Sequence, residues 1–346
     1  MQKIKVALAG FGSGGRIYNA PIIAALDEFL IMKILTGNPD NIQAANQDFP
    51  EAEVVQEYSD ILEDTEIDLV VITTPNHLHK EYAEKALMAG KHVVVEKPLS
   101  PTYAEAEYLT ALAAKRNRIL SVNHNRRWDS DIRTIRKIIQ GKQLGKVVEF
   151  ESHFDRFRPE IKNSWKEKDD NPGSGILYDL GSHLIDQALW LFGAPTEVFA
   201  HLRAQREKSE VVDNFEVLLL YPDLKVTLKA GMLVKEPGPR YQVFGNKGSF
   251  IKSGMDVQEE ALKNGRKPGP DWGKEPQHLW GRISTIEGSE LVESETGDYR
   301  EFYKNIAAAI RGEEELQVSP QQASMVIKVI ELAYRSHSEN RILPFD

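Results

Sequence analysis

The chain of 346 residues contains no cysteine and no apolar run long enough to span a membrane. The absence of cysteine excludes disulfides, thiol catalysis and cysteine-ligated zinc, and it fits a reducing cytoplasm. The N-terminal stretch does not read as a secretory signal, so we expect a cytoplasmic protein without a membrane segment. The balance of 52 Asp and Glu against 43 Lys and Arg gives a net charge of −9, which disfavours nucleic acid as a partner.

Strands and helices alternate over the first 123 residues. The apolar run at 68–74 is nearly continuous, which is typical of a parallel strand covered on both faces. The other strand patterns, separated by helical ones, lie at 4–9, 30–35, 92–96 and 119–122. The alternation predicts an α/β domain over residues 1–123 with a doubly wound parallel sheet.

The pattern changes in residues 124–346, where hairpin signals replace the alternation. Pro222-Asp223 separates two strand patterns, and Gly245-Asn246-Lys247-Gly248 separates two more. Residues 264–282 are rich in glycine and proline and predict a long irregular loop, followed by helices near 299–311 and 320–337. We therefore expect an α+β second domain with mainly antiparallel strands.

A glycine motif follows the first strand directly. Gly10, Gly12 and Gly15 have the G-x-G-x-x-G spacing, between a buried strand and an amphipathic helix. Such a turn lets the backbone approach a pyrophosphate, which then sits at the positive end of the next helix. The motif predicts a dinucleotide cofactor.

The end of the second strand bears on the choice of cofactor. NAD enzymes usually carry Asp or Glu there to hold the ribose hydroxyls, but Thr36-Gly37-Asn38 has no carboxylate. Thr36 and Asn38 could donate hydrogen bonds to a 2′-phosphate. The residues at the end of the second strand favour NADP as the cofactor, with NAD as the alternative.

Two further segments carry chemistry. Lys97 follows a buried strand, at the carboxyl edge where doubly wound sheets bind ligands, and can bond a hydroxyl or polarise a carbonyl. Asp179 and His183 are four residues apart, so on a helix they share one face, and a carboxylate-oriented histidine can accept an alcohol proton. A surface ion pair or a buried polar contact is the alternative for that pair.

Taken together, these motifs resemble one family. Gly10-x-Gly12-x-x-Gly15, Thr74-Pro75-Asn76-x-x-His79, Glu96-Lys97-Pro98 and Asp179-x-x-x-His183 form the motif series of the glucose–fructose oxidoreductase/inositol dehydrogenase (Gfo/Idh/MocA) family. Segments 125–131, 150–156 and 173–183 look like the branch that contains NADP-dependent scyllo-inositol dehydrogenases.

The resemblance implies roles for the matching residues. Gly10, Gly12 and Gly15 would hold the pyrophosphate, and Thr74, Pro75, Asn76, His79, Glu96 and Lys97 would line the cofactor. Lys97, Asp179 and His183 would be catalytic and bind substrate, a small-molecule polyol or sugar. The family's second domain has a large open sheet, which implies a homodimer or homotetramer.

Several alternatives stay open. Arg127, Trp128 and Arg156 are candidates for binding substrate hydroxyls, with ion pairing or packing as the alternative. Gly37-Asn38 stands where NADP-using relatives tend to carry Ser-Arg, so NAD is retained. A redox-neutral NAD-dependent sugar hydrolase or epimerase, or a non-catalytic NADP sensor, would use the same fold. We expect no bound metal, since Asp179, His183 and Asp186 on one helix face are common without one.

Overall fold

The computed structural model describes residues 2–162, 164–168 and 172–346, which form two compact units. The first unit combines Met1–Asn125 with two later segments, Gln258–Trp272 and Asp298–Ser324. The second unit contains Arg126–Val257, Gly273–Gly297 and Met325–Asp346. Across the described part of the chain, none of the helices combines the length and apolarity that crossing a membrane requires.

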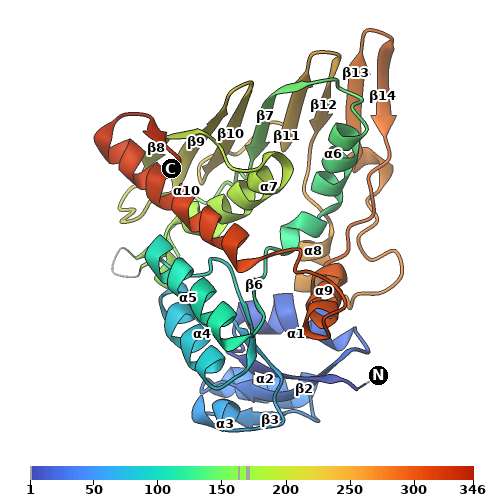
Figure 1. Ribbon diagram of the computed structural model, residues 1–346. Coiled ribbons are helices and arrows are strands. Elements are labelled where there is room, and N and C mark those ends of the chain that lie inside the picture. Colours follow the sequence, from blue (N-terminus) through green and yellow to red (C-terminus); the bar gives the residue numbers. More distant parts are fainter. Residues whose placement is uncertain (1, 163, 169–171) are drawn as a thin grey trace. The chain divides into compact units, whose positions relative to one another are not determined.

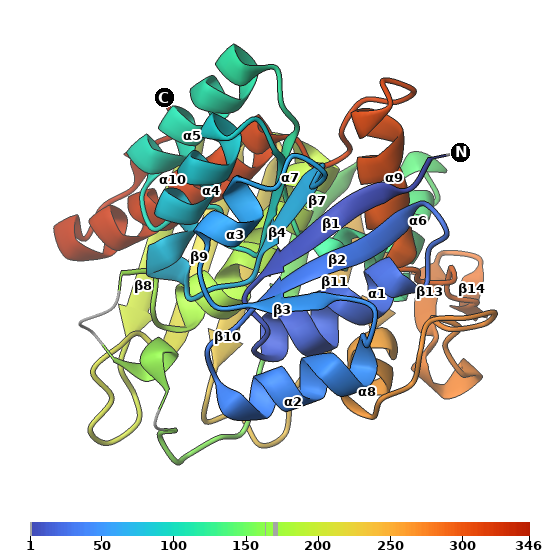
Figure 2. The same cartoon turned by 90° about the horizontal axis from the view of Figure 1, so that it is seen from below.

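The described strands of the first unit form a six-stranded sheet in which every neighbouring pair is parallel. The chain winds from β1 to β2 and β3, then returns to β4 on the other side of β1 (Figure 2). In doubly wound sheets, ligands bind at the carboxyl ends of the strands where the winding reverses. The predicted doubly wound parallel sheet is confirmed. In sheet order its strands are β3 (Glu53–Val55), β2 (Phe29–Leu35), β1 (Ile4–Ala9), β4 (Leu69–Ile72), β5 (His92–Val95) and β6 (Leu120–Val122).

Helices flank this sheet, and their ends carry local stop and start signals. Thr102 and Glu105 form a reciprocal capping box at the start of α5, and Asn117 ends it in the left-handed conformation. The helices before residue 125 are η1 (Gly14–Asn19), α1 (Ala20–Ala24), α2 (Pro39–Asp48), α3 (Ser59–Leu62), η2 (Asn76–Leu78), α4 (His79–Met88) and α5 (Tyr103–Arg116). The returning segments add α8 (Gln258–Lys263) and α9 (Arg300–Ile310).

A nine-stranded sheet dominates the described part of the second unit. Only the pair β7 and β10 is parallel among its described neighbours, so the sheet is mainly antiparallel as expected. Both predicted hairpins are present, as β9–β10 and β11–β12. In sheet order the strands are β14 (Gly288–Val292), β13 (Gly281–Thr285), β12 (Gly248–Lys252), β11 (Tyr241–Gly245), β7 (Val147–His153), β10 (Leu224–Gly231), β9 (Asn214–Tyr221), β8 (Glu197–Arg203) and β15 (Leu343–Pro344).

Helices cover one face of this sheet (Figure 1). In β9, the buried Phe215, Val217 and Leu219 alternate with the half-exposed Glu216 and Leu218, which matches a strand with one covered face. The helices that lie wholly or mostly in the second unit are η3 (Asn125–Trp128), α6 (Ser130–Gln140), η4 (Trp165–Glu167), η5 (Leu177–Gly181), α7 (Ser182–Phe192), η6 (Gln277–Leu279) and α10 (Pro320–Glu339).

Three features depart from the expected elements. The stretch 264–282 is not irregular throughout, because η6 and the first residues of β13 fall within it. β14 has no buried residue, so no apolar alternation marks it in the sequence. The return of α8 and α9 to the first unit also has no local sequence signal.

Candidate active site

The glycine turn between β1 and η1 fits a close approach of a ligand to the backbone. Gly10 has a φ of +109°, and a Cβ on Gly15 would lie 2.5 Å from the Gly10 carbonyl oxygen, so the chain can fold back here only without side chains. A Cβ on Gly12 would meet no described protein atom within 4 Å. The Thr73 hydroxyl donates to the Gly10 carbonyl at 2.8 Å. A tight turn at the switch point, with open space beside Gly12, suits a pyrophosphate.

The end of β2 carries polar groups without a carboxylate. Thr36 is buried, and Asn38 caps the N-terminus of α2, where its Oδ1 accepts from the backbone N–H groups of Asp40 and Asn41 at 3.0 and 3.1 Å. The cap commits Oδ1 to the helix and leaves the amide NH2 as the donor end of Asn38.

His79 lies between two loops at the carboxyl edge. The ring is fully buried, with Nδ1 2.7 Å from the Pro98 carbonyl oxygen and Nε2 2.9 Å from the Thr74 carbonyl oxygen. Burial outweighs these two acceptors and lowers the pKa of His79 to about 4. The neutral ring has one N–H, so it donates to one carbonyl at a time. His79 thus packs between the loops that carry Asn76 and Lys97 and bonds one of them, and its own contact with a cofactor stays a prediction.

The Glu96 carboxylate anchors the segment that carries Lys97. Its Oε1 accepts from the side-chain amides of Asn19 at 2.6 Å and Asn123 at 2.8 Å. The Tyr303 hydroxyl donates to Asn19 Oδ1 at 2.5 Å, and burial raises the pKa of Tyr303 well above its usual value. The backbone N–H of Lys97 donates to Glu96 Oε2 at 3.2 Å. The network around Glu96 therefore includes three residues that the sequence analysis did not identify: Asn19, Asn123 and Tyr303.

Two of these missed residues had a usable signal. Asn19 follows the glycine motif, and Asn123 directly follows a predicted buried strand, so both stand at the carboxyl edge by topology. Tyr303 had none, because it reaches Asn19 across 284 residues.

In the second unit, Asp179 and His183 lie on either side of a change in helix type. Asp179 belongs to the π-helical η5 and His183 to α7, so the predicted α-helical i, i+4 geometry does not apply. Asp179 Oδ1 accepts from Lys166 Nζ at 2.6 Å, a partner that sequence reasoning missed. His183 is 8% exposed. Within the described residues, no cluster of three or more His, Asp or Glu side chains could hold a metal ion.

The three candidates for binding substrate hydroxyls have different surroundings. Arg127 is buried and donates to both oxygens of Asp186, at 2.9 and 2.6 Å. Trp128 is buried, and the half-buried Arg156 guanidinium lies 4.9 Å from the centre of the Phe154 ring. Ion pairing accounts for Arg127 in this structure, and substrate contact by all three stays a prediction.

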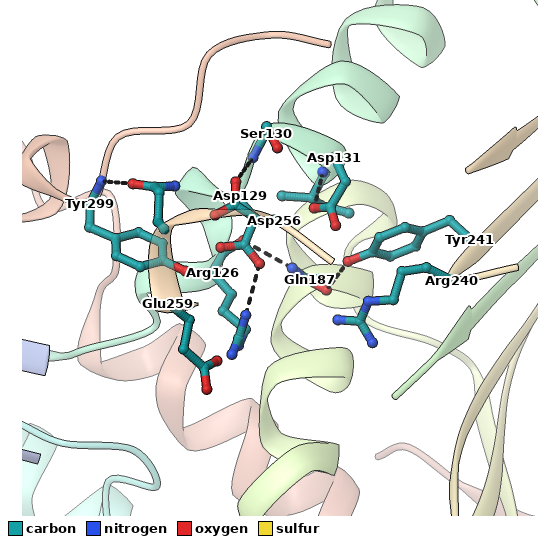
Figure 3. A network of polar contacts seen from close by, with 12 residues as sticks. Arg126, Asp129, Ser130, Asp131, Gln187, Arg240, Tyr241, Asp256, Glu259 and Tyr299 are labelled. Atoms are coloured by element: carbon teal, nitrogen blue, oxygen red, sulfur yellow. Dashed lines mark hydrogen bonds and ion pairs between the residues drawn. The ribbon is translucent and has the colours of Figure 1, made fainter. Parts of the chain in front are cut away.

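A polar network fixes the segment before α6 (Figure 3). Arg126 Nη1 pairs with Asp129 Oδ2 at 3.1 Å, and its carbonyl oxygen accepts from the Gln187 amide at 2.9 Å. The Tyr241 hydroxyl donates to Gln187 Oε1 at 2.9 Å. These bonds connect η3, α7 and β11, and both arginines of η3, Arg126 and Arg127, are buried.

Two family models match the chain along most of its length. The model described as "Oxidoreductase family, NAD-binding Rossmann fold" matches residues 4–124, and the model described as "Oxidoreductase family, C-terminal alpha/beta domain" matches residues 136–345. The chain belongs to the Gfo/Idh/MocA oxidoreductase family. It is therefore an oxidoreductase with a Rossmann domain for NAD or NADP, as the motif series predicted.

Individual relatives of this Gfo/Idh/MocA oxidoreductase match over almost their full length. It is 43% identical to scyllo-inositol 2-dehydrogenase (NADP(+)) IolW of Bacillus subtilis, over 98% of this chain and 95% of the relative. It is 42% identical to YdgJ of Escherichia coli, an uncharacterized oxidoreductase, over 96% of both chains. The solved structure of the oxidoreductase YvaA from Bacillus subtilis is 41% identical, with a TM-score of 0.96, covering 100% of this chain and 99% of that one.

We expect Asp186→Ala to lower the free energy of unfolding by about 3–5 kcal/mol, because it removes the carboxylate that neutralises a buried guanidinium. Denaturation by urea, followed by circular dichroism, measures the change. Glu81→Ala is the control, since it breaks a similarly short but half-exposed pair with Lys85 and should change stability by less than about 1 kcal/mol. Equal midpoints for the two variants would contradict a structural role for the Arg127–Asp186 pair.

The stability of this Gfo/Idh/MocA oxidoreductase should fall in acid partly through His79. Its folded pKa is about 4 and the ordinary value is 6.5, so the unfolded chain takes up the proton first. The contribution is complete above pH 6.5 and is lost as the pH falls to 4, by up to about 3 kcal/mol.

Guanidinium unfolding at several pH values tests this expectation. His79→Asn should be less stable at pH 7.5 but should show a shallower decline between pH 6.5 and 4. His201→Asn, at an exposed histidine, should decline as the wild type does. The expectation is contradicted if the free energy of unfolding falls equally steeply with pH in His79→Asn and in wild type.

Proposed function

We propose that the chain is an NAD(P)-dependent dehydrogenase acting on a secondary alcohol of a cyclic polyol or sugar, with scyllo-inositol as the first candidate. The observation that carries the proposal is its nearly full-length similarity to the Bacillus subtilis scyllo-inositol dehydrogenase. The residue types at positions 97, 179 and 183 support it, because they suit proton transfer at a hydroxyl group.

The proposed chemistry gives Lys97, His183 and Asp179 different roles. Lys97 would donate a hydrogen bond to the reacting hydroxyl oxygen, and His183 would accept the hydroxyl proton during oxidation and return it during reduction. Asp179 would accept a hydrogen bond from the substrate and orient its ring. When bound, the nicotinamide would accept the hydride from the carbon atom that bears the reacting hydroxyl group.

We propose NADP as the preferred cofactor, with NAD as the alternative. The segment Thr36-Gly37-Asn38 has no carboxylate to repel a 2′-phosphate, and the amide NH2 of Asn38 can donate to one. The glycine turn would hold the pyrophosphate, with Thr74, Pro75, Asn76 and Glu96 beside the cofactor.

We also propose that the protein is a homodimer or homotetramer. The strands of the second sheet carry half-exposed apolar residues opposite the helix-covered face, among them Leu218 and Leu220. A second copy of the chain would remove these from water.

The wild-type protein should reduce NADP⁺ with scyllo-inositol, measured as absorbance of the reduced nicotinamide, and prefer NADP⁺ to NAD⁺. Lys97→Ala and His183→Ala should each lower kcat/KM by about 100-fold or more, since a positioned acid or base contributes 10²–10⁴-fold. The same assay is run with a panel of candidate substrates that also contains myo-inositol, glucose and xylose.

Binding of NADPH, followed by fluorescence, checks that each variant still folds. Near-full turnover by folded Lys97→Ala and His183→Ala proteins would contradict the assigned roles. NADPH binding without turnover of any compound by wild type would favour a sensor, whereas cofactor retained through purification would favour a redox-neutral reaction.

A further inference from the structure

Lys166 is an ion-pair partner of a residue to which the proposed function gives a role. Its Nζ donates to Asp179 Oδ1 at 2.6 Å, and the two side chains are 46% and 22% exposed. The pair therefore stays in contact with solvent, unlike the buried Arg127–Asp186 pair. Exposed ion pairs contribute about 0–1 kcal/mol to stability, so stability does not account for this contact.

The segment that carries Lys166 is held by a buried arginine. The Arg206 side chain is 1% exposed and pairs with Glu167 Oε2 at 2.6 Å and with Asp213 Oδ2 at 2.8 Å. Asp213 also accepts from the backbone N–H groups of Gln205 and Arg206, at 2.6 and 3.0 Å. Glu167, next to Lys166, is thus fixed to the interior of the unit.

Backbone bonds fix Lys166 itself. The N–H of Gly175 donates to the Lys166 carbonyl oxygen at 2.9 Å, and Ser164 Oγ accepts from the Lys166 N–H at 3.4 Å. The Trp165 ring lies 5.7 Å from Nζ. These bonds hold the Lys166 backbone near Asp179, and the bond from Nζ to Oδ1 joins its ammonium group to that carboxylate.

We propose that Lys166 is a positioning residue, which holds the Asp179 carboxylate in place as an acceptor for substrate hydroxyls. The inference rests on the proposed function, in which Asp179 orients the substrate. An ionised carboxylate only accepts hydrogen bonds, so the Lys166–Asp179 pair selects a ligand that donates, such as a neutral polyol. The ammonium has three N–H donors, and one bond to Asp179 does not exhaust them.

Steady-state kinetics of Lys166→Ala, Lys166→Arg and Lys168→Ala test the proposal. Lys166→Ala should raise KM for the polyol or lower kcat/KM by about 10–100-fold, as expected when a charged hydrogen bond is lost. KM for NADP⁺ and the melting temperature should stay near wild type. Lys166→Arg should recover most of the activity, and Lys168→Ala, at an exposed lysine on the same segment, should behave as wild type.

The outcomes separate this inference from the proposed function. A wild type that turns over no compound of the panel overturns both. An active wild type with Lys166→Ala within twofold of it overturns only the positioning role. A large loss of melting temperature or of NADPH binding in Lys166→Ala, without recovery in Lys166→Arg, shows a folding role instead and also overturns it.

Discussion

The Glu96 carboxylate is the contact on which the ligand-binding edge of the first unit depends. One of its oxygens accepts from Asn19, which follows the glycine turn, and from Asn123, which follows β6. The end of η1 and the carboxyl ends of β5 and β6 are thereby joined through a single side chain that follows β5. Hydrogen bonds to an ionised carboxylate are stronger than neutral ones, especially away from water. Lys97 takes its place from this arrangement, because it is the next residue in the chain.

The same network explains why the cofactor unit needs chain from the second half. Tyr303 on α9 donates to Asn19, and Ser121 in β6 donates to the Val318 carbonyl oxygen at 2.8 Å. A fragment that ended at residue 123 would lack both partners and would expose polar groups that are buried in the whole protein. A division of the chain at residue 123 therefore follows the order of the sequence, whereas residues 258–272 and 298–324 pack with the first unit.

Local signals in the sequence predicted the parallel sheet, the glycine turn and both hairpins, because each depends on neighbouring residues. The partners of the site residues depend on distant ones. Asn19 and Tyr303 are 284 residues apart, and no periodicity relates them. Lys166 and Asp179 are only 13 residues apart, but no periodicity in the sequence relates them. The π-helical turn at Asp179 likewise breaks the α-helical spacing on which the predicted pairing with His183 relied.

Two ion pairs of the second unit show how burial decides what a charge does. Arg127 with Asp186 and Lys166 with Asp179 have the same closest distance of 2.6 Å, but the side chains of the first pair are each 2% exposed. In the first pair, both charges have lost water, so each depends on the other and the pair holds η3 to α7. In the second pair, water still competes for both groups, so the contact adds little stability and leaves the Asp179 carboxylate accessible from solvent. The Arg206 side chain, which holds the segment through Glu167, is buried, whereas the Lys166 side chain is half-exposed, so a buried ion pair fixes the chain and an exposed one contacts Asp179.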